Sequence, residues 1–150
     1  GVMVFALTRP AQRNLGLQFE RRKVRKTYVA RVSGQLQPAT GEVDLPLIVD
    51  WPNRPRQKVC HDTGKPARTT WRVQRRTEGE TRVKLMPQTG RSHQLRVHMA
   101  ELGHPILGDP FYAEGVARDG YPRLMLHSEE LRLHHPDGGA GTGFRAPAPF

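Results

Sequence analysis

The sequence predicts an α+β fold in which a mixed, mostly antiparallel β-sheet is flanked by a few helices and long loops. The expected strands outnumber the expected helices, and the two do not alternate as they would in a parallel βαβ sheet. A short turn at Glu78-Gly79-Glu80 also joins two strand-like segments as in an antiparallel hairpin. With 150 residues and no internal repeat, we expect a single domain, or part of one, with a sizeable core.

The N-terminal segment is a continuous apolar run over residues 2–7, which predicts a strand buried on both faces. Thr8 is expected to cap a helix over about residues 10–22. Its buried face is predicted to hold Ala11, Leu15 and Phe19. Core strands rarely begin at residue two and Gly1 is not an initiator, so we expect this sequence to be the C-terminal part of a longer protein.

The rest of the sheet is expected from period-two alternation and from turn residues. A strand over residues 27–32 places Tyr28, Ala30 and Val32 on one face. Further strands are expected at 68–75, 81–86, 124–133 and 143–146. Residues 34–44 and 103–122 read as turn-rich connections, and 46–66 as a long excursion stiffened by prolines.

A second helix is expected to follow the turn at Gly90, with Ser92 as its N-cap and Gly103 at its end. Leu95, Met99 and Leu102 recur at helical spacing and define its buried side.

Two potential cations, Arg91 and His93, lie at the start of this helix, where the helix dipole disfavours positive charge. Cations placed beside free backbone N–H groups indicate an anion site, most simply one for phosphate. A solvated helix start without a ligand is the alternative interpretation.

The charge balance indicates a nucleic-acid partner. Lys and Arg number 24 against 14 Asp and Glu, a net charge of +10. The excess is clustered: residues 9–31 hold eight basic side chains against Glu20 alone, and residues 54–76 hold eight against Asp62 alone. An anionic membrane surface is the weaker alternative, because no continuous basic amphipathic helix is present. No apolar run approaches the length of a membrane span.

Motifs for metal or nucleotide chemistry are not found. His93 and His98 point about 140° apart on a helix, so one ion could not bridge them. Cys60-His61 has no second pair at metal-ligand spacing, and neither a phosphate-binding glycine loop nor a nucleophile elbow occurs. We therefore expect no metal and no cofactor. The single cysteine fits a reducing cytoplasm.

Five segments, in order along essentially the whole chain, together resemble RluA-family pseudouridine synthases. They are Lys26–Ala30, Thr89–His98, Gly108–Tyr112, Leu126–Ser128 and Phe144–Pro147. Residues 44–48, 50–55 and 58–60 are similar to the family member that acts on both a large-subunit rRNA loop and a tRNA anticodon stem-loop.

The resemblance implies roles for particular residues. Tyr28 matches the tyrosine that stacks on the flipped base and is proposed to move the C5 proton, and Arg96 matches the basic residue that pairs with the catalytic aspartate. Leu126 falls in the apolar wall beneath the base. Gly1 matches the last glycine of the motif that carries the aspartate, which puts that acid five residues before Gly1. The residues implied to hold RNA backbone and sugar are Arg91, His93 and Gln94.

The resemblance therefore implies isomerisation of uridine to pseudouridine in rRNA and tRNA loops, without a cofactor. The catalytic aspartate would lie outside this chain, which is then expected to be inactive alone. Arg54, Arg56 and Lys58 in the proline-stiffened excursion are expected to contact RNA phosphates. We expect a cytoplasmic monomer that binds RNA and no membrane. The alternatives are a non-catalytic RNA-binding protein that kept the fold and a general polyanion binder.

Overall fold

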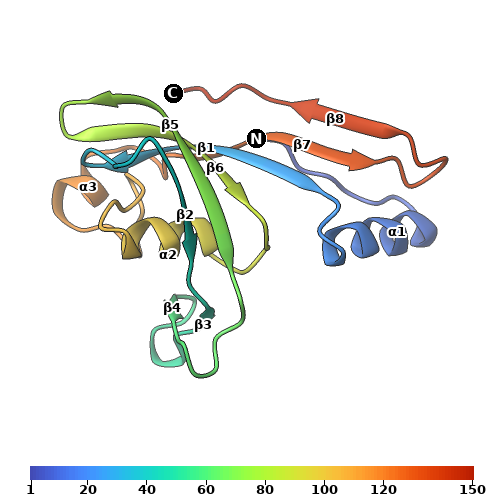
Figure 1. Ribbon diagram of the computed structural model, residues 1–150, viewed down its shortest axis with the longest axis horizontal. Coiled ribbons are helices and arrows are strands. Elements are labelled where there is room, and N and C mark those ends of the chain that lie inside the picture. The colour runs from blue at the N-terminus through green and yellow to red at the C-terminus, as the bar shows by residue number, and fades with distance from the viewer.

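Six antiparallel strands form the central sheet of the computed structural model, which describes residues 1–150. Two further strands, β3 and β4, form a separate sheet. In chain order the eight strands are β1 (Arg25–Ser33), β2 (Thr40–Asp44), β3 (Leu47–Val49), β4 (Gln57–Val59), β5 (Arg68–Thr77), β6 (Glu80–Pro87), β7 (Leu126–His134) and β8 (Gly141–Arg145). The helices are α1 (Arg9–Glu20), α2 (Gln94–Glu101) and α3 (Gly115–Asp119), with a 3-10 turn at Trp51–Asn53. The order in the large sheet is β2-β5-β6-β1-β7-β8, and β3 pairs only with β4 (Figure 1). The predicted fold class is confirmed.

Both longer helices lie on one side of the sheet, at opposite ends of it (Figure 1). The main core lies between α2 and the sheet, where Ala30, Val32 and Leu85 are fully buried against Leu95 and Met99. The predicted spacing of Leu95 and Met99 is thus confirmed. The longest helix has 12 residues, and none of the helices is long and apolar enough to cross a membrane.

A smaller core lies under α1, where Leu15 packs with Val24, Leu131 and Leu133. The predicted cap is confirmed, since Thr8 Oγ1 accepts a hydrogen bond from the N–H of Ala11 at 3.3 Å.

The predicted buried face of α1 is wrong at one position. Phe19 is 40 % exposed, whereas Gln18 is buried. The Gln18 amide donates to the His134 carbonyl and accepts from the His134 N–H, at 2.7 and 2.9 Å. A polar side chain buried through backbone hydrogen bonds leaves no apolar signal, so the sequence pattern could not reveal it.

The apolar run at the N-terminus is not a strand buried on both faces. Val2, Val4 and Ala6 pack against the smaller core, but Met3, Phe5 and Leu7 are 74, 75 and 94 % exposed. The segment is extended, and the N–H of Val2 donates to the Ser128 carbonyl at 2.8 Å. Only one side of it is therefore covered by the chain described.

Three expected connections contain regular structure. Residues 34–44 include β2, which approaches β5 so closely that a Cβ on Gly41 would collide with the Trp71 ring. Residues 46–66 contain the β3–β4 hairpin, and 103–122 contain α3. These elements have three to five residues, too short for a periodic signal in the sequence. The other predicted strands are confirmed within a few residues of their bounds.

Gly108 allows the loop after α2 to pass close to the chain before β7. Its φ is +76°, and a Cβ there would collide with the Arg123 carbonyl oxygen. We expect Gly108→Ala to lower the free energy of unfolding by about 2–4 kcal/mol, from overpacking and the left-handed backbone together. Urea denaturation measures this change. Gly138→Ala is the control, because Gly138 has a φ of +86° but open space around it. Equal losses for the two variants would contradict the steric argument.

Candidate active site

A pocket of about 440 Å³ opens between β1, the end of β6 and the start of α2. It gathers six of the residues singled out from the sequence: Tyr28, Arg91, His93, Gln94, Arg96 and Leu126. Phe19, Lys26, Pro87, Thr89, Gly90 and Leu95 complete its lining. Residues far apart in the sequence are thus brought to one place. Their chemical roles stay predictions.

Tyr28 projects from β1 on the same face as Ala30 and Val32, as predicted, and it packs against the edge of the main core. Its neighbours across the sheet are Leu85 on β6 and Ser128 on β7. Burial raises the pKa of the Tyr28 phenol, and a hydrogen bond with Ser128 opposes that rise. The phenol is therefore protonated at neutral pH, with its ring beside the pocket. Leu126, paired with Ala30, forms the adjacent apolar wall.

Arg96 is held by a buried ion pair with Asp109. Its Nε and Nη2 donate to the two carboxylate oxygens at 2.8 and 2.7 Å. The Asp109 side chain is fully buried, and Oδ1 also accepts from the N–H groups of Phe111 and Tyr112 at 2.9 and 3.2 Å. Burial by itself would raise the pKa of Asp109, but the hydrogen bonds from Arg96, Phe111 and Tyr112 hold it below its ordinary value. The carboxylate therefore stays charged and fixes the guanidinium.

Two aromatic rings complete the frame around Arg96. The guanidinium carbon lies 5.1 Å from the Phe111 ring centroid and 5.2 Å from that of Tyr112. A bidentate pair uses two of the five N–H donors of an arginine, so the others remain for a ligand in the pocket. The side chain is 14 % exposed, so its direction is set by the protein.

His93 is joined to this frame through Tyr112. The Tyr112 hydroxyl accepts a hydrogen bond from the N–H of Gln57 at 2.8 Å and lies 2.7 Å from Nδ1 of His93, to which it can donate. Burial and the charge of Arg96 lower the pKa of His93 against the opposing effect of Asp109. His93 is therefore neutral at pH 7.

The start of α2 differs from the prediction. His93 is the N-cap, with φ 53° in the left-handed region, and Ser92 is exposed and does not cap the helix. The Gln94 amide is what closes the turn: its oxygen accepts from the Thr89 hydroxyl and the Arg91 N–H at 2.6 and 3.1 Å. Its nitrogen donates to the Arg68 carbonyl at 2.9 Å and the Thr69 hydroxyl at 3.1 Å.

Gln94 therefore holds the pocket wall through hydrogen bonds from both its amide oxygen and its amide nitrogen. Its predicted contact with RNA stays a prediction. Arg91 is held by one hydrogen bond, in which its Nε donates to the Pro66 carbonyl at 3.0 Å.

The predicted end of helix α2 is confirmed, with Gly103 at a φ of +83° directly after Leu102.

Lys26 and Asp109 were missed as site residues. Lys26 lines the pocket, its Nζ donates to the Thr89 carbonyl at 3.2 Å, and burial lowers its pKa. Alternation along a strand puts Lys26 on the face of Tyr28, a signal that could have been used. Asp109 carried no such signal, because its partner is 13 residues away and reached only through the fold.

The three cations of the proline-stiffened excursion do not line the pocket. They lie on the β3–β4 hairpin, all exposed. Arg54 stacks on the Trp51 ring at 4.0 Å, and Arg56 lies 5.8 Å from the centroid of Phe111, the ring that also contacts Arg96. Lys58 is paired with Ile48. The hairpin is thus an exposed basic rim connected to the pocket through Phe111.

The structure places His93 and His98 among different partners. His98 is buried between the Thr69 hydroxyl and the Leu45 carbonyl, both at 2.9 Å, away from His93. No group of three His, Cys, Asp or Glu side chains in the chain could hold a metal ion.

The chain belongs to the RNA pseudouridylate synthase family, whose sequence profile matches residues 1–101. The dual-specificity RNA pseudouridine synthase RluA of Escherichia coli K12 is 58% identical over all of this chain, which spans 69% of that protein. RluA of Yersinia pestis is 55% identical, with 73% of its length covered. Among solved structures, the human protein "RNA Pseudouridylate Synthase Domain Containing 1" is similar, with a TM-score of 0.82 at 30% sequence identity. The match covers 97% of this chain and 63% of the human chain. The family expected from the sequence is confirmed.

The substitution Asp109→Asn should separate the charge of this side chain from its hydrogen bonds. The amide would still accept from two N–H groups but would leave Arg96 without its counter-charge, so we expect a loss of about 3 kcal/mol in the free energy of unfolding at pH 7. Because the folded pKa of Asp109 is lowered, its contribution is complete above the ordinary carboxyl pKa and is lost as pH falls through the folded value. The difference between the two proteins in chemical denaturation should therefore begin to shrink below about pH 4 and disappear only below the folded pKa of Asp109. A gap that persists at lower pH would show that charge is not the cause.

Proposed function

We propose that this chain carries the base-binding part of an RNA pseudouridine synthase catalytic domain. The reaction is an isomerisation: the bond between N1 and C1′ of a uridine breaks, a bond between C5 and C1′ forms, C5 loses its proton and N1 gains one. Atoms and electrons balance without an external reactant, so no cofactor is required. The proposed catalytic carboxylate is the aspartate that the family resemblance implies five residues before Gly1.

One observation carries this proposal: the start of the chain lies next to the pocket. The N–H of Val2 bonds to the Ser128 carbonyl, and Ser128 is the cross-strand partner of Tyr28. Five residues span at most about 17 Å, so an aspartate at that place can reach the space between Tyr28 and Arg96. An arginine whose direction is already set by Asp109 can hold a second carboxylate ionised without first being ordered.

The pocket suits a base that has been taken out of an RNA loop. Flipping a uridine costs a few kcal/mol, and stacking on an aromatic ring returns about 1–3 kcal/mol. Tyr28 supplies the ring and Leu126 the adjacent apolar wall. Arg91 and His93 at the mouth, with the basic hairpin beyond, would hold backbone and sugar. The proposed substrates are structured loops of large-subunit rRNA and tRNA, and the proposed setting is a monomer in the cytoplasm.

An isomerisation assay on the full-length protein tests the proposal. RNA fragments carrying the rRNA and tRNA loops are labelled with tritium at C5 of uridine, and release of tritium to water reports the reaction. We expect release that depends on the upstream aspartate and on Arg96. Tight binding of both fragments without release would favour the alternative, a non-catalytic RNA-binding protein that kept the fold.

Arg96→Ala in the full-length protein should abolish turnover and leave RNA affinity within a few-fold. The guanidinium orders the aspartate, whereas most of the binding energy comes from phosphate contacts elsewhere. Single-turnover kinetics and filter binding measure the two quantities separately.

The Arg96 experiment needs a control for stability, because the substitution leaves Asp109 buried without a partner. The double variant Arg96→Gln, Asp109→Asn removes both charges and keeps polar side chains at both positions. Full activity in either folded variant would remove the role assigned to Arg96.

Neutralising Arg54, Arg56 and Lys58 to glutamine should flatten the dependence of log K on log salt. Each lost phosphate contact reduces the slope by about 0.9 on duplex RNA and about 0.7 on a single strand. Titrations at several salt concentrations measure the slope. An unchanged slope would mean that the hairpin does not meet RNA.

A further inference from the structure

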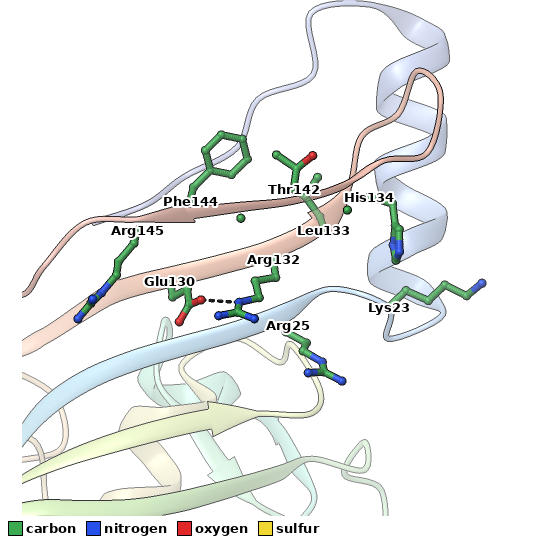
Figure 2. Close-up of a pocket in the computed structure, with 11 residues that line it drawn as sticks. Lys23, Arg25, Glu130, Arg132, Leu133, His134, Thr142, Phe144 and Arg145 are labelled. Atoms are coloured by element: carbon green, nitrogen blue, oxygen red, sulfur yellow. Dashed lines mark hydrogen bonds and ion pairs between the residues drawn. The ribbon is translucent and has the colours of Figure 1, made fainter.

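A second basic surface lies away from the pocket, over the ends of β1, β7 and β8. It is a groove of about 610 Å³. Lys23, Arg25, Arg132 and Arg145 line it against one acid, Glu130, and only two of its 11 lining residues are hydrophobic. Figure 2 shows cationic side chains from separate segments on the same side of the sheet, with Glu130 paired to Arg132.

The register of the sheet puts like charges directly opposite each other in this groove. Arg25 on β1 pairs with Arg132 on β7. Such a pair is destabilising by itself, so the arrangement does not serve the fold. Arg132 is 64 % and Arg145 is 65 % exposed, and their carboxylate neighbours neutralise them only in part.

Strand β8 carries glycine at two positions that line the groove. Gly143 pairs with Arg132, and Gly141 pairs with His134. A Cβ on Gly143 would lie 3.6 Å from Cγ of Arg132, an ordinary contact, and one on Gly141 would meet nothing within 4 Å. Neither glycine has a left-handed φ, so neither is required by the backbone. The two positions therefore add no side chain over this part of the groove.

The groove and the candidate active site lie on opposite faces of the sheet but are joined at its end. Arg25 and Lys26 are consecutive on β1, so their side chains point to opposite faces. Arg25 lines the groove and Lys26 the pocket. The turn between α1 and β1 connects the two, and its Arg22 lines a further hollow of about 320 Å³ together with Lys26 and Arg91. The basic run from Arg21 to Lys26 thus follows the surface from one face to the other.

Arg22 occupies a backbone conformation that favours glycine. Its φ is 56°, one of two such values outside glycine in the chain, the other being that of His93 at the pocket. Sparsely populated backbone conformations of this kind cluster at active sites and ligand-binding segments. Here the side chain continues the line of cations between pocket and groove.

We propose that this groove binds the phosphate backbone of the helical stem adjoining the target loop, as a second RNA contact separate from base recognition. The identity of the RNA rests on the proposed function, whereas the preference for a phosphate backbone rests on the groove itself. An open groove lined by four cations and only two hydrophobic residues matches a charged strand rather than a membrane surface. The stem then extends around the end of the sheet while the loop enters the pocket.

The test uses the full-length protein with Arg25→Gln, Arg132→Gln and Arg145→Gln combined. The matched control removes three exposed arginines at the far end of the sheet and on α3: Arg72→Gln, Arg75→Gln and Arg118→Gln. Two RNAs are compared, a minimal hairpin with the target loop and the same loop on a long stem. Thermal unfolding without RNA confirms that both triple variants are folded.

We expect the groove variant to bind the long-stem RNA about tenfold more weakly, with a salt slope reduced by about 0.9 per lost contact. Its affinity for the minimal hairpin and its single-turnover rate at saturating RNA should not change, and the control should lose neither. Equal losses on both RNAs, equal losses in the control, or no loss at all would overturn the proposal. If the unaltered protein releases no tritium while the groove variant still loses affinity for the long stem, the groove stands and the isomerase proposal falls.

Discussion

The ion pair between Arg96 and Asp109 is the interaction on which the rest of the site depends. It joins α2 to the loop before α3 through two charge-assisted hydrogen bonds. The same carboxylate anchors the N–H groups of Phe111 and Tyr112, and the Tyr112 hydroxyl in turn reaches His93 and the β3–β4 hairpin. One buried charge therefore sets the direction of an arginine, two rings and the attachment of the basic rim.

Burying a carboxylate to hold a loop is energetically unfavourable by itself. Removing a charge from water costs several kcal/mol of solvation free energy, and the ion pair offsets only part of that loss. An apolar contact of the same volume would serve stability as well. What the ion pair supplies is a guanidinium whose position is fixed before any ligand arrives, so a reacting carboxylate would not have to order it. His93 is neutral and Tyr28 is protonated, so neither adds a charge beside the Arg96–Asp109 pair.

The elements that the sequence predicted well are those whose signal is local. The α1 cap at Thr8, the hairpin at Glu78-Gly79 and the glycine after α2 depend on neighbouring residues only. Buried Gln18 and the side-chain bonds of Gln94 depend on partners distant in the chain, so periodicity could not show them. The residues of the site were recognised by resemblance to a family. Their arrangement, above all the pairing of Arg96 with Asp109, needed the fold.

The distribution of charge gives the sheet two different surfaces. Around the pocket the cations are individually held, as Lys26 is by the Thr89 carbonyl and Arg91 by the Pro66 carbonyl, and such restraint suits recognition of one nucleotide. In the groove Arg132 and Arg145 are more than half exposed, and Arg25 lies directly opposite Arg132 on the neighbouring strand. This arrangement suits contacts with a phosphate backbone that do not depend on the base sequence. Exposed charges on one face can increase affinity for any RNA of the right shape. Under the proposed function, the ordered charges on the other face would decide which uridine reacts, so general affinity and selectivity would come from different faces of the sheet.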